Sequence, residues 1–178
     1  METHHFIERD FAAAQRGRDL ALVMFGFAHF ERFSEEVGSA AADAAVVEFG
    51  RVLARMTRRM NMSVRCGWRT GAFLSVLSGG DADAARMFVL RVREAAAKVE
   101  PGMPPIQAGI AVYQPQMRSP EELVQEAERS LAAAEADPKA ADRPPHRGPS
   151  PLERGDQGAW RSHTGRTLGV SPKGFFRG

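Results

Sequence analysis

The chain has 178 residues, and 43% of them are hydrophobic, enough to bury one core of ordinary size. Its 24 Lys and Arg residues nearly balance 22 Asp and Glu residues, leaving a net charge of +2, which is not typical of a dedicated nucleic-acid binder. The single cysteine, Cys66, excludes an internal disulfide framework and a zinc finger.

The N-terminal segment METHHFIERD is charged where a secretory signal peptide would be apolar. The longest apolar run, residues 20–28, is less than half of the roughly 20 residues that a membrane helix needs. We therefore expect a cytoplasmic protein that does not bind a membrane.

The first part of the chain predicts an amphipathic lead-in, a strand and a long helix. Residues 7–15 are amphipathic, and residues 20–28 (LALVMFGFA) form a near-continuous apolar run, typical of a strand buried on both faces. Residues 39–60 predict a long helix, because their apolar positions recur every three or four residues. These positions are Ala42, Val46, Phe49, Leu53 and Met56.

The following part of the sequence predicts a hairpin, a helix, a strand and a final helix. Residues 63–68 and 73–77 are short strand-like runs around Arg69, Thr70 and Gly71. A helix is expected over residues 81–98, capped by Asp81 or Gly80. A strand follows over residues 106–113, and Ser119-Pro120-Glu121-Glu122 has the composition of a helix start.

Composition changes sharply at Pro138. Residues 138–178 hold six of the 11 prolines and seven of the 17 glycines, and their eight Lys and Arg against three Asp and Glu give a charge of +5. We expect a domain over residues 1–137 and a basic tail over residues 138–178 that is mostly disordered. The element order βααββαβα predicts an α/β sandwich with a mixed central sheet flanked by helices.

Four stretches of the sequence resemble the GGDEF domain of bacterial diguanylate cyclases over about residues 5–137. They are LALVMFGFAHFERFSEEVGSAAADA, VRCGWRTGAFLSVL, IQAGIAVYQ and SPEELVQEAERSLAAA. Family members carry Asp-x-Asp-x-Phe-Lys-x-x-Asn-Asp-x-x-Gly-His-x-x-Gly-Asp after the first strand. Here only Phe30, Gly38 and Asp43 match that pattern.

The resemblance implies that the catalytic metal site has been lost. The family holds divalent metal with carboxylates on the first strand and the hairpin, where the metal activates a ribose hydroxyl and neutralises triphosphate charge. Gly26 replaces the strand aspartate, and Arg69, Thr70, Gly71 and Ala72 replace Gly-Gly-Asp/Glu-Glu. We therefore expect no metal, no cofactor and no cyclase activity.

Nucleotide-binding positions of the family are also altered. Ser34 replaces the asparagine that contacts guanine, whereas Asp43 keeps its place and is a candidate residual nucleotide contact, or else a solvated or capping acid. Glu135 stands where the family has a lysine that pairs with phosphate. The inhibitory Arg-x-x-Asp that binds cyclic di-GMP corresponds to residues 60–63, MNMS, so cyclic di-GMP binding is not expected.

The tail carries isolated large apolar residues, Trp160, Leu168, Phe175 and Phe176. Such residues are typical anchors where a disordered segment folds onto a protein partner. The alternatives are an extension without a role, or loose attraction to phosphates and nucleic acid through the tail's positive charge.

Together these features predict a catalytically inactive GGDEF-like domain that serves as a protein-interaction or regulatory module in bacterial signalling. The alternative is a receptor that binds GTP or cyclic di-GMP through Asp43 and nearby arginines without converting it.

Overall fold

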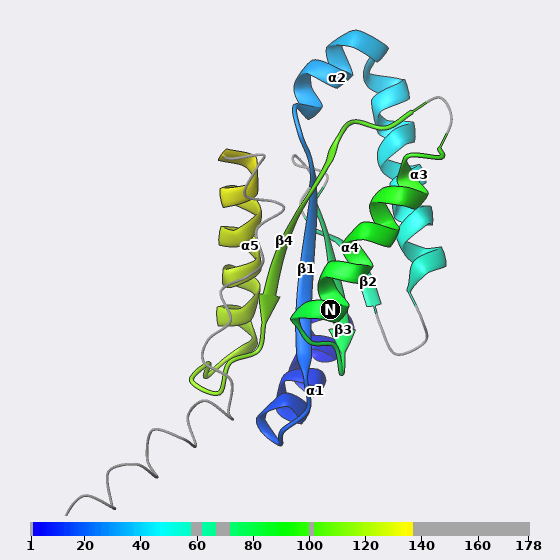
Figure 1. The fold of residues 1–178 in the computed structure, drawn as a ribbon. Coiled ribbons are helices and arrows are strands. Elements are labelled where there is room, and N and C mark those ends of the chain that lie inside the picture. Colours follow the sequence, from blue (N-terminus) through cyan, green and yellow to red (C-terminus); the bar gives the residue numbers. More distant parts are fainter. Residues whose placement is uncertain (1, 58–61, 67–71, 100–101, 137–178) are drawn as a thin grey trace, which may run out of the picture. The chain divides into compact units, whose positions relative to one another are not determined.

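A computed structural model describes residues 2–57, 62–66, 72–99 and 102–136 (Figure 1). Within these ranges a four-stranded sheet has β1 between β3 and β4, with β2 outside β3. The strands are β1 (Leu20–Phe27), β2 (Met62–Cys66), β3 (Ala72–Ser78) and β4 (Ile106–Val112).

The helices of the described ranges are α1 (Glu2–Gln15), α2 (Phe30–Val37), α3 (Ser39–Met56), α4 (Ala82–Ala96) and α5 (Pro120–Ala136). After α1, the strands and helices together follow the predicted order, βααββαβα. The prediction that the long helix reaches residue 60 is wrong, because Thr57 is extended and its N–H closes the helix on the Leu53 carbonyl at 2.9 Å. None of these helices is long and apolar enough to cross a bilayer.

The expected fold class is confirmed, but the expected mixed pairing of the sheet is not. All the strand pairs described are antiparallel: β1 with β3, β1 with β4 and β2 with β3. The physical reason is that the second hairpin strand, β3, pairs with β1. Strand β2 runs in the direction of β1 but is separated from it by β3, so no parallel neighbours arise.

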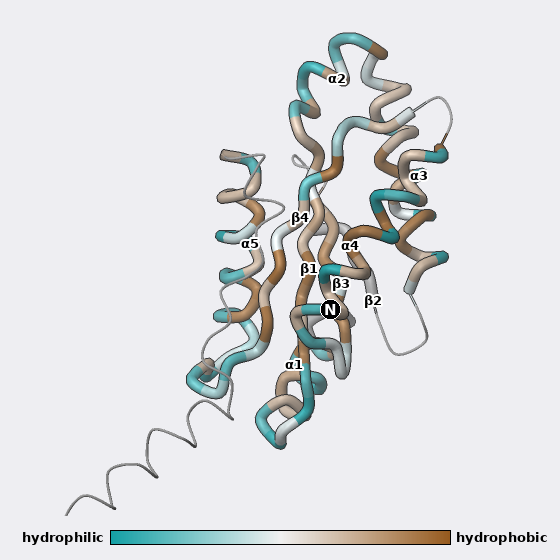
Figure 2. The backbone as a smooth tube through the Cα atoms, viewed as in Figure 1, coloured by the Kyte–Doolittle hydropathy of each residue, from teal (hydrophilic) through white to brown (hydrophobic). Residues whose placement is uncertain are grey.

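Helices cover both faces of the sheet (Figure 1), and every residue of β1 is buried as predicted. Alternate β1 side chains enter two cores, because side chains on a strand point to opposite faces. Ala21, Val23, Phe25 and Phe27 join the core with α3 and α4. Leu20, Leu22 and Met24 join the core with α1 and α5. The continuous hydrophobic colour of β1 in Figure 2 reflects this double burial.

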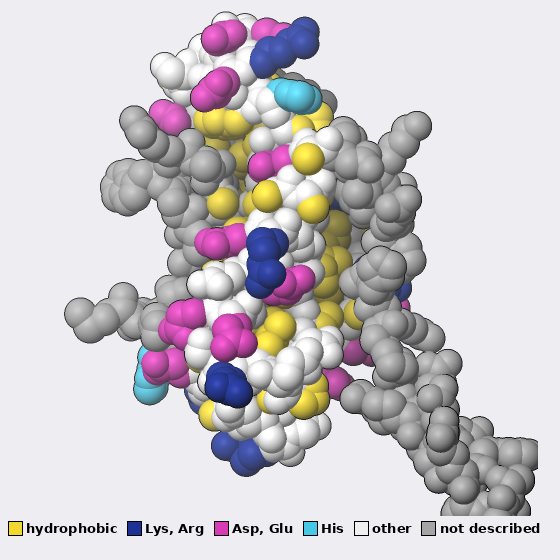
Figure 3. Space-filling view, turned by 90° about the vertical axis from the view of Figure 1, so that its left-hand side faces the viewer, with side chains coloured by type: hydrophobic (Ala, Val, Ile, Leu, Met, Phe, Trp, Pro, Cys, Tyr) yellow, Lys and Arg dark blue, Asp and Glu magenta, His cyan; other side chains and the backbone are white. Residues whose placement is uncertain are grey.

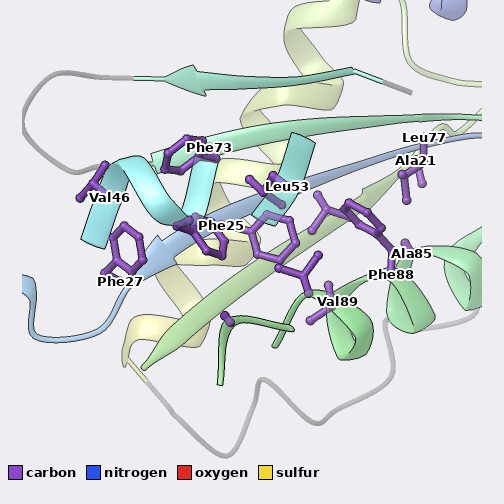
Figure 4. Packing of buried hydrophobic residues seen from close by; sticks show 14 residues of the cluster. Ala21, Phe25, Phe27, Val46, Leu53, Phe73, Leu77, Ala85, Phe88 and Val89 are labelled. Carbon is purple, nitrogen blue, oxygen red and sulfur yellow. The ribbon is translucent and has the colours of Figure 1, made fainter. Parts of the chain in front are cut away.

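The core beneath α3 is aromatic. The Phe49 ring meets Phe25, Phe27 and Phe73 edge to face, with centroid distances of 5.7, 5.2 and 5.2 Å. Figure 4 shows Phe25, Phe27 and Phe73 turned toward this shared core. Each such pair contributes about 1 kcal/mol beyond its buried area, so Phe73 is a packing residue.

Helix α5 lies unusually close to β4 at Gly109. A Cβ atom there would lie 2.2 Å from the Leu131 nitrogen and 2.5 Å from the Ala127 carbonyl oxygen, so only glycine fits. The neighbouring Ile110 N–H donates to Ser130 Oγ at 3.0 Å. This close approach fixes where the C-terminal end of α5 lies against the sheet.

Candidate functional site

The chain turns sharply between β1 and α2. Ala28 donates its N–H to the Pro105 carbonyl at 2.8 Å, and Phe33 donates to the His29 carbonyl at 3.0 Å. His29 itself has φ 53° and ψ 40°, a left-handed conformation that is uncommon outside glycine. This turn carries the chain from the end of a buried strand directly into an exposed helix.

A pocket of about 350 Å³ lies at this turn. It gathers side chains from the end of β1, the start of α2, the first part of β4 and the end of α5. Its described lining residues are Phe27, Ala28, His29, Phe30, Glu31, Gln107 and Glu135. The Phe27 and Phe30 rings stack, with centroids 5.7 Å apart and planes at 30°.

Gly26 and Glu135, two positions where the sequence departs from the resembled family, lie together beside this pocket. A Cβ atom on Gly26 would lie 3.4 Å from Glu135 Oε1 and 3.3 Å from Leu131 Cδ2. The position that the resemblance assigns to the family's strand carboxylate is therefore bordered by the carboxylate of Glu135. An acid at both positions would bring two like charges close together.

Gln107 completes the polar lining, and sequence reasoning did not single it out. It lies opposite Gly26 in the β1 and β4 register, and its Nε2 donates to the Ala134 carbonyl at 3.3 Å. Its Oε1 is buried and has no hydrogen-bond partner in the described part of the chain. The available signal was a lone polar side chain in an otherwise apolar strand, IQAGIAV.

The structure does not bring Ser34 and Asp43 into this pocket. Ser34 is half-buried on α2, and Asp43 is exposed in the second turn of α3. A larger hollow of about 840 Å³ lies between the α2–α3 pair and Val99, Gly102 and Met103. Neither Ser34 nor Asp43 is among its described lining residues. Val37 and Val47, which line that hollow, are 44% and 51% exposed.

The remaining predicted site residues fall in two groups. Ala72 is buried at the start of β3 and pairs with Cys66, so its position holds a core methyl group. The rest lie outside the described residues: Arg69, Thr70 and Gly71 in the hairpin, and Trp160, Leu168, Phe175 and Phe176 in the tail.

The side chains around the pocket do not fit the divalent metal that the resemblance implies. In the described ranges no three His, Cys, Asp or Glu side chains gather closely enough to hold a metal ion. Residues 67–71, GWRTG, contain no carboxylate, and hard cations such as Mg²⁺ prefer carboxylate oxygens. We therefore assign no catalytic step to a metal here.

Comparison with protein families decides the identity of the domain. The model of the family described as "Diguanylate cyclase, GGDEF domain" matches residues 3–140. The chain belongs to this family. No curated protein matches the GGDEF chain significantly.

Solved structures show the same fold for this GGDEF domain. The GGDEF domain of DgcB from Caulobacter crescentus, in complex with c-di-GMP, has a TM-score of 0.66 at 18% identity, over 75% of this chain and 80% of that one. The active GGEEF domain of a diguanylate cyclase from Vibrio cholerae has 0.67 at 15% identity, over 75% and 88%. Diguanylate cyclase SiaD with its activator SiaC, from Pseudomonas aeruginosa, has 0.66 at 18% identity, over 76% and 54%.

Proposed function

We propose that this GGDEF domain is catalytically inactive and acts as a protein-interaction or regulatory module in bacterial signalling. The observation that carries the proposal is the juxtaposition of Gly26 and Glu135. The strand position that should supply a metal ligand has no side chain, and the carboxylate of Glu135 lies next to it.

The chemistry of cyclisation makes these two changes decisive. Joining two GTP molecules requires a ribose hydroxyl to attack an α-phosphate, and metal ions lower the barrier by neutralising charge on the polyphosphate. Here a negative side chain borders the pocket instead. Like charges repel, and the exposed Glu135 carboxylate lacks the positive charge with which the family's lysine pairs with phosphate, so Glu135 opposes triphosphate binding.

The retained packing supports an interaction role for the domain. Phe30, Phe73 and Gly109 serve the core and the close approach of α5, so the scaffold is kept where the catalytic positions are not. Val37 and Val47 expose apolar surface beside a hollow, and exposed apolar patches commonly mark protein contacts. A protein activator is bound to SiaD, a GGDEF relative of the same fold.

The proposal includes the partner classes and the location. We propose protein partners in the cytoplasm, with Trp160, Leu168, Phe175 and Phe176 of the tail as further anchors, and no membrane or nucleic-acid partner. Although the DgcB domain is bound to c-di-GMP, residues 60–63 here lack the Arg and Asp of the inhibitory motif. Cyclic di-GMP is therefore not among the proposed ligands.

The test of inactivity is a product assay. The full chain is incubated overnight with GTP and either Mg²⁺ or Mn²⁺, and cyclic di-GMP is measured by chromatography, with the active Vibrio cholerae GGEEF domain as positive control. We expect no product from this chain. Steady formation of cyclic di-GMP would overturn the proposal.

The alternative, a nucleotide receptor that uses Asp43, needs a separate measurement. Isothermal titration with GTP and with cyclic di-GMP, each with and without Mg²⁺, distinguishes the two roles. We expect no heat of binding, since Asp43 is exposed and lines neither of the hollows described above. Micromolar binding that Asp43→Ala abolishes would favour the receptor.

A further inference from the structure

We propose that the outer edge of β4 binds an extended peptide of a protein partner as an added antiparallel strand, with an acidic residue of that peptide beside Arg93. This inference rests on the proposed interaction role and deepens it by naming a surface and the chemistry of its partner. Backbone hydrogen bonds along the edge supply most of the contact, as in other cases of strand addition.

The backbone of β4 has one side without a strand neighbour in the described sheet. The strand order is β2-β3-β1-β4, so β4 pairs with β1 alone (Figure 1). Ala28 donates its N–H to the Pro105 carbonyl at 2.8 Å, just before β4 begins. Just after β4 ends, Tyr113 donates to the Leu20 carbonyl at 2.8 Å. Because hydrogen-bonded and non-hydrogen-bonded pairs alternate along antiparallel strands, the odd-numbered residues of β4 bond to β1 and the even-numbered residues direct their N–H and C=O groups outward.

The middle of this outer edge is capped by α5. Ile110 donates its N–H to Ser130 Oγ at 3.0 Å. In the described part of the chain, the N–H groups of Ile106, Ala108 and Val112 form no hydrogen bond outside the sheet. Natural sheet edges are commonly protected by charged residues or prolines within the strand, but β4, IQAGIAV, contains neither. Within the described ranges, its remaining outward groups are thus available to another strand.

The side chains of the outward-directed residues are incompletely buried. Ile106, Ala108, Ile110 and Val112 pack against the core with α3 and α4 but are only half-buried, whereas every residue of the central strand β1 is buried. Figure 3, viewed from the α5 side, shows hydrophobic side chains along both margins of that helix. Directly opposite side chains on paired strands lie about 5 Å apart, so apolar residues at alternate positions of an added strand would complete this burial.

A basic side chain lies at the start of the edge. Arg93, on α4, lines a hollow of about 310 Å³ together with Ile106, the first residue of β4. Arg86 on the same helix pairs with Asp83 at 2.8 Å, but Arg93 forms no ion pair with a described residue, and no carboxylate is among the described lining of the hollow. An antiparallel strand ends beside the start of β4, so an acid at its C-terminal end would pair with Arg93.

A partner peptide fits this charge better than a second copy of the chain. Antiparallel pairing of β4 with β4 of a second copy would bring residues 112–116, VYQPQ, beside Arg93, and these contain no carboxylate. Residues 138–151 of the chain contain five prolines, which cannot donate to a strand ladder. The geometry therefore points to a partner segment that alternates apolar residues and ends in Asp or Glu.

A peptide titration followed by NMR tests the proposal. The ¹⁵N-labelled full chain is titrated with acetyl-Thr-Val-Thr-Val-Glu-amide, and with the backbone N-methylated form of this peptide, which cannot donate strand hydrogen bonds. We expect saturable shifts centred on Ile106 and Ala108, slower hydrogen exchange of both N–H groups, and at least tenfold weaker binding of the methylated peptide. Equal shifts with both peptides, or no shifts with either at millimolar concentration, would overturn the proposal.

A proline substitution tests the role of the strand edge. Ala108→Pro removes an outward N–H, while the N–H groups that bond to β1 are kept. It should weaken the peptide at least tenfold, whereas Ala108→Ser keeps the N–H and should bind as the parent chain does. Equal weakening by both variants would contradict strand addition.

A charge substitution that leaves the strand untouched gives an independent readout. Arg93→Gln should weaken the peptide about fivefold, and it should not weaken a peptide that ends in Gln instead of Glu. Arg91→Gln is the matched control, because Arg91 is exposed on the same helix and does not line the hollow. Equal effects of the two variants on the peptide that ends in Glu would contradict the assigned position of the acid.

The remaining outcomes separate this inference from the proposed function. Self-association of the free chain that Ala108→Pro abolishes, measured by sedimentation, would assign the edge to a second copy and overturn the inference. If no peptide binds and no cyclic di-GMP is formed in the product assay, the inference fails while the proposed function stands. Formation of cyclic di-GMP would overturn the proposed function whatever the peptides do.

Discussion

Gly26 and Glu135 lie next to each other, and the missing side chain at position 26 leaves room for the Glu135 carboxylate. The Cβ atom of an aspartate at the buried position 26 would lie 3.4 Å from Glu135 Oε1 and 3.3 Å from Leu131 Cδ2, so its carboxylate would be crowded, partly desolvated and close to a like charge. We expect Gly26→Asp to lower the free energy of unfolding by about 2 kcal/mol. Urea denaturation of the variant and the parent chain measures this difference.

A double-mutant cycle then tests whether the effect is electrostatic. Adding Glu135→Lys to Gly26→Asp replaces repulsion with attraction, so the double variant should be at least about 1 kcal/mol more stable than the sum of the single changes predicts. Additive changes would mean that the Gly26→Asp penalty comes only from crowding against Leu131.

A second prediction for a single residue concerns Gly109, where a substitution should change stability through packing alone. An alanine Cβ would overlap the backbone of α5 at Leu131 and Ala127, so the helix must move away from β4. We expect Gly109→Ala to cost about 3 kcal/mol or more, measured by urea denaturation. Ala133→Gly, on the exposed side of α5, is the control and should cost about 1 kcal/mol through helix propensity.

Sequence alone could indicate the altered positions of the site but not how they meet. Gly26 and Glu135 were singled out separately, each by departure from a family pattern. Their contact depends on α5 packing against β4 at Gly109, a long-range feature that local periodicity does not encode. Gln107 was missed for the same reason, since only the strand register places it opposite Gly26.

Among single elements, helix α4 offers a test, because its N-terminal cap can be removed by one substitution. Asp81 Oδ1 accepts the Ala84 N–H at 2.8 Å, which confirms the capping role expected for Gly80 or Asp81. Asp81→Ala should cost about 1 kcal/mol of unfolding free energy, measured by thermal denaturation. Asp43→Ala, which removes an exposed acid on α3, should change it by less than about 0.5 kcal/mol; equal effects would contradict the capping account.

Element order was predictable because apolar spacing distinguishes helices from strands. The pairing of the strands and the ends of the helices were less predictable. The antiparallel arrangement depends on which hairpin strand takes the place beside β1, and both choices bury the same apolar residues. The end of α3 at Met56 depends on the extended backbone of Thr57, which a continuing polar and apolar pattern does not signal.

In the whole molecule, we propose that the folded domain provides stability and that the tail contributes to partner binding. Truncation after Asp137 should leave the urea midpoint of the domain unchanged, because the described cores lie within residues 2–136. It should also weaken capture of protein partners by the immobilised chain, quantified by mass spectrometry. Unchanged recovery of the same partners would assign recognition to the folded surface alone.

The proposed inactivity requires that metal-supported triphosphate binding at the end of β1 has been lost, and paramagnetic broadening measures this binding directly. Mn²⁺ is added with GTP to the ¹⁵N-labelled full chain, and signal loss is followed amide by amide. We predict no selective broadening at Gly26, Phe27 or Ala28. Selective loss of those signals, present only when GTP and Mn²⁺ are both added, would contradict it.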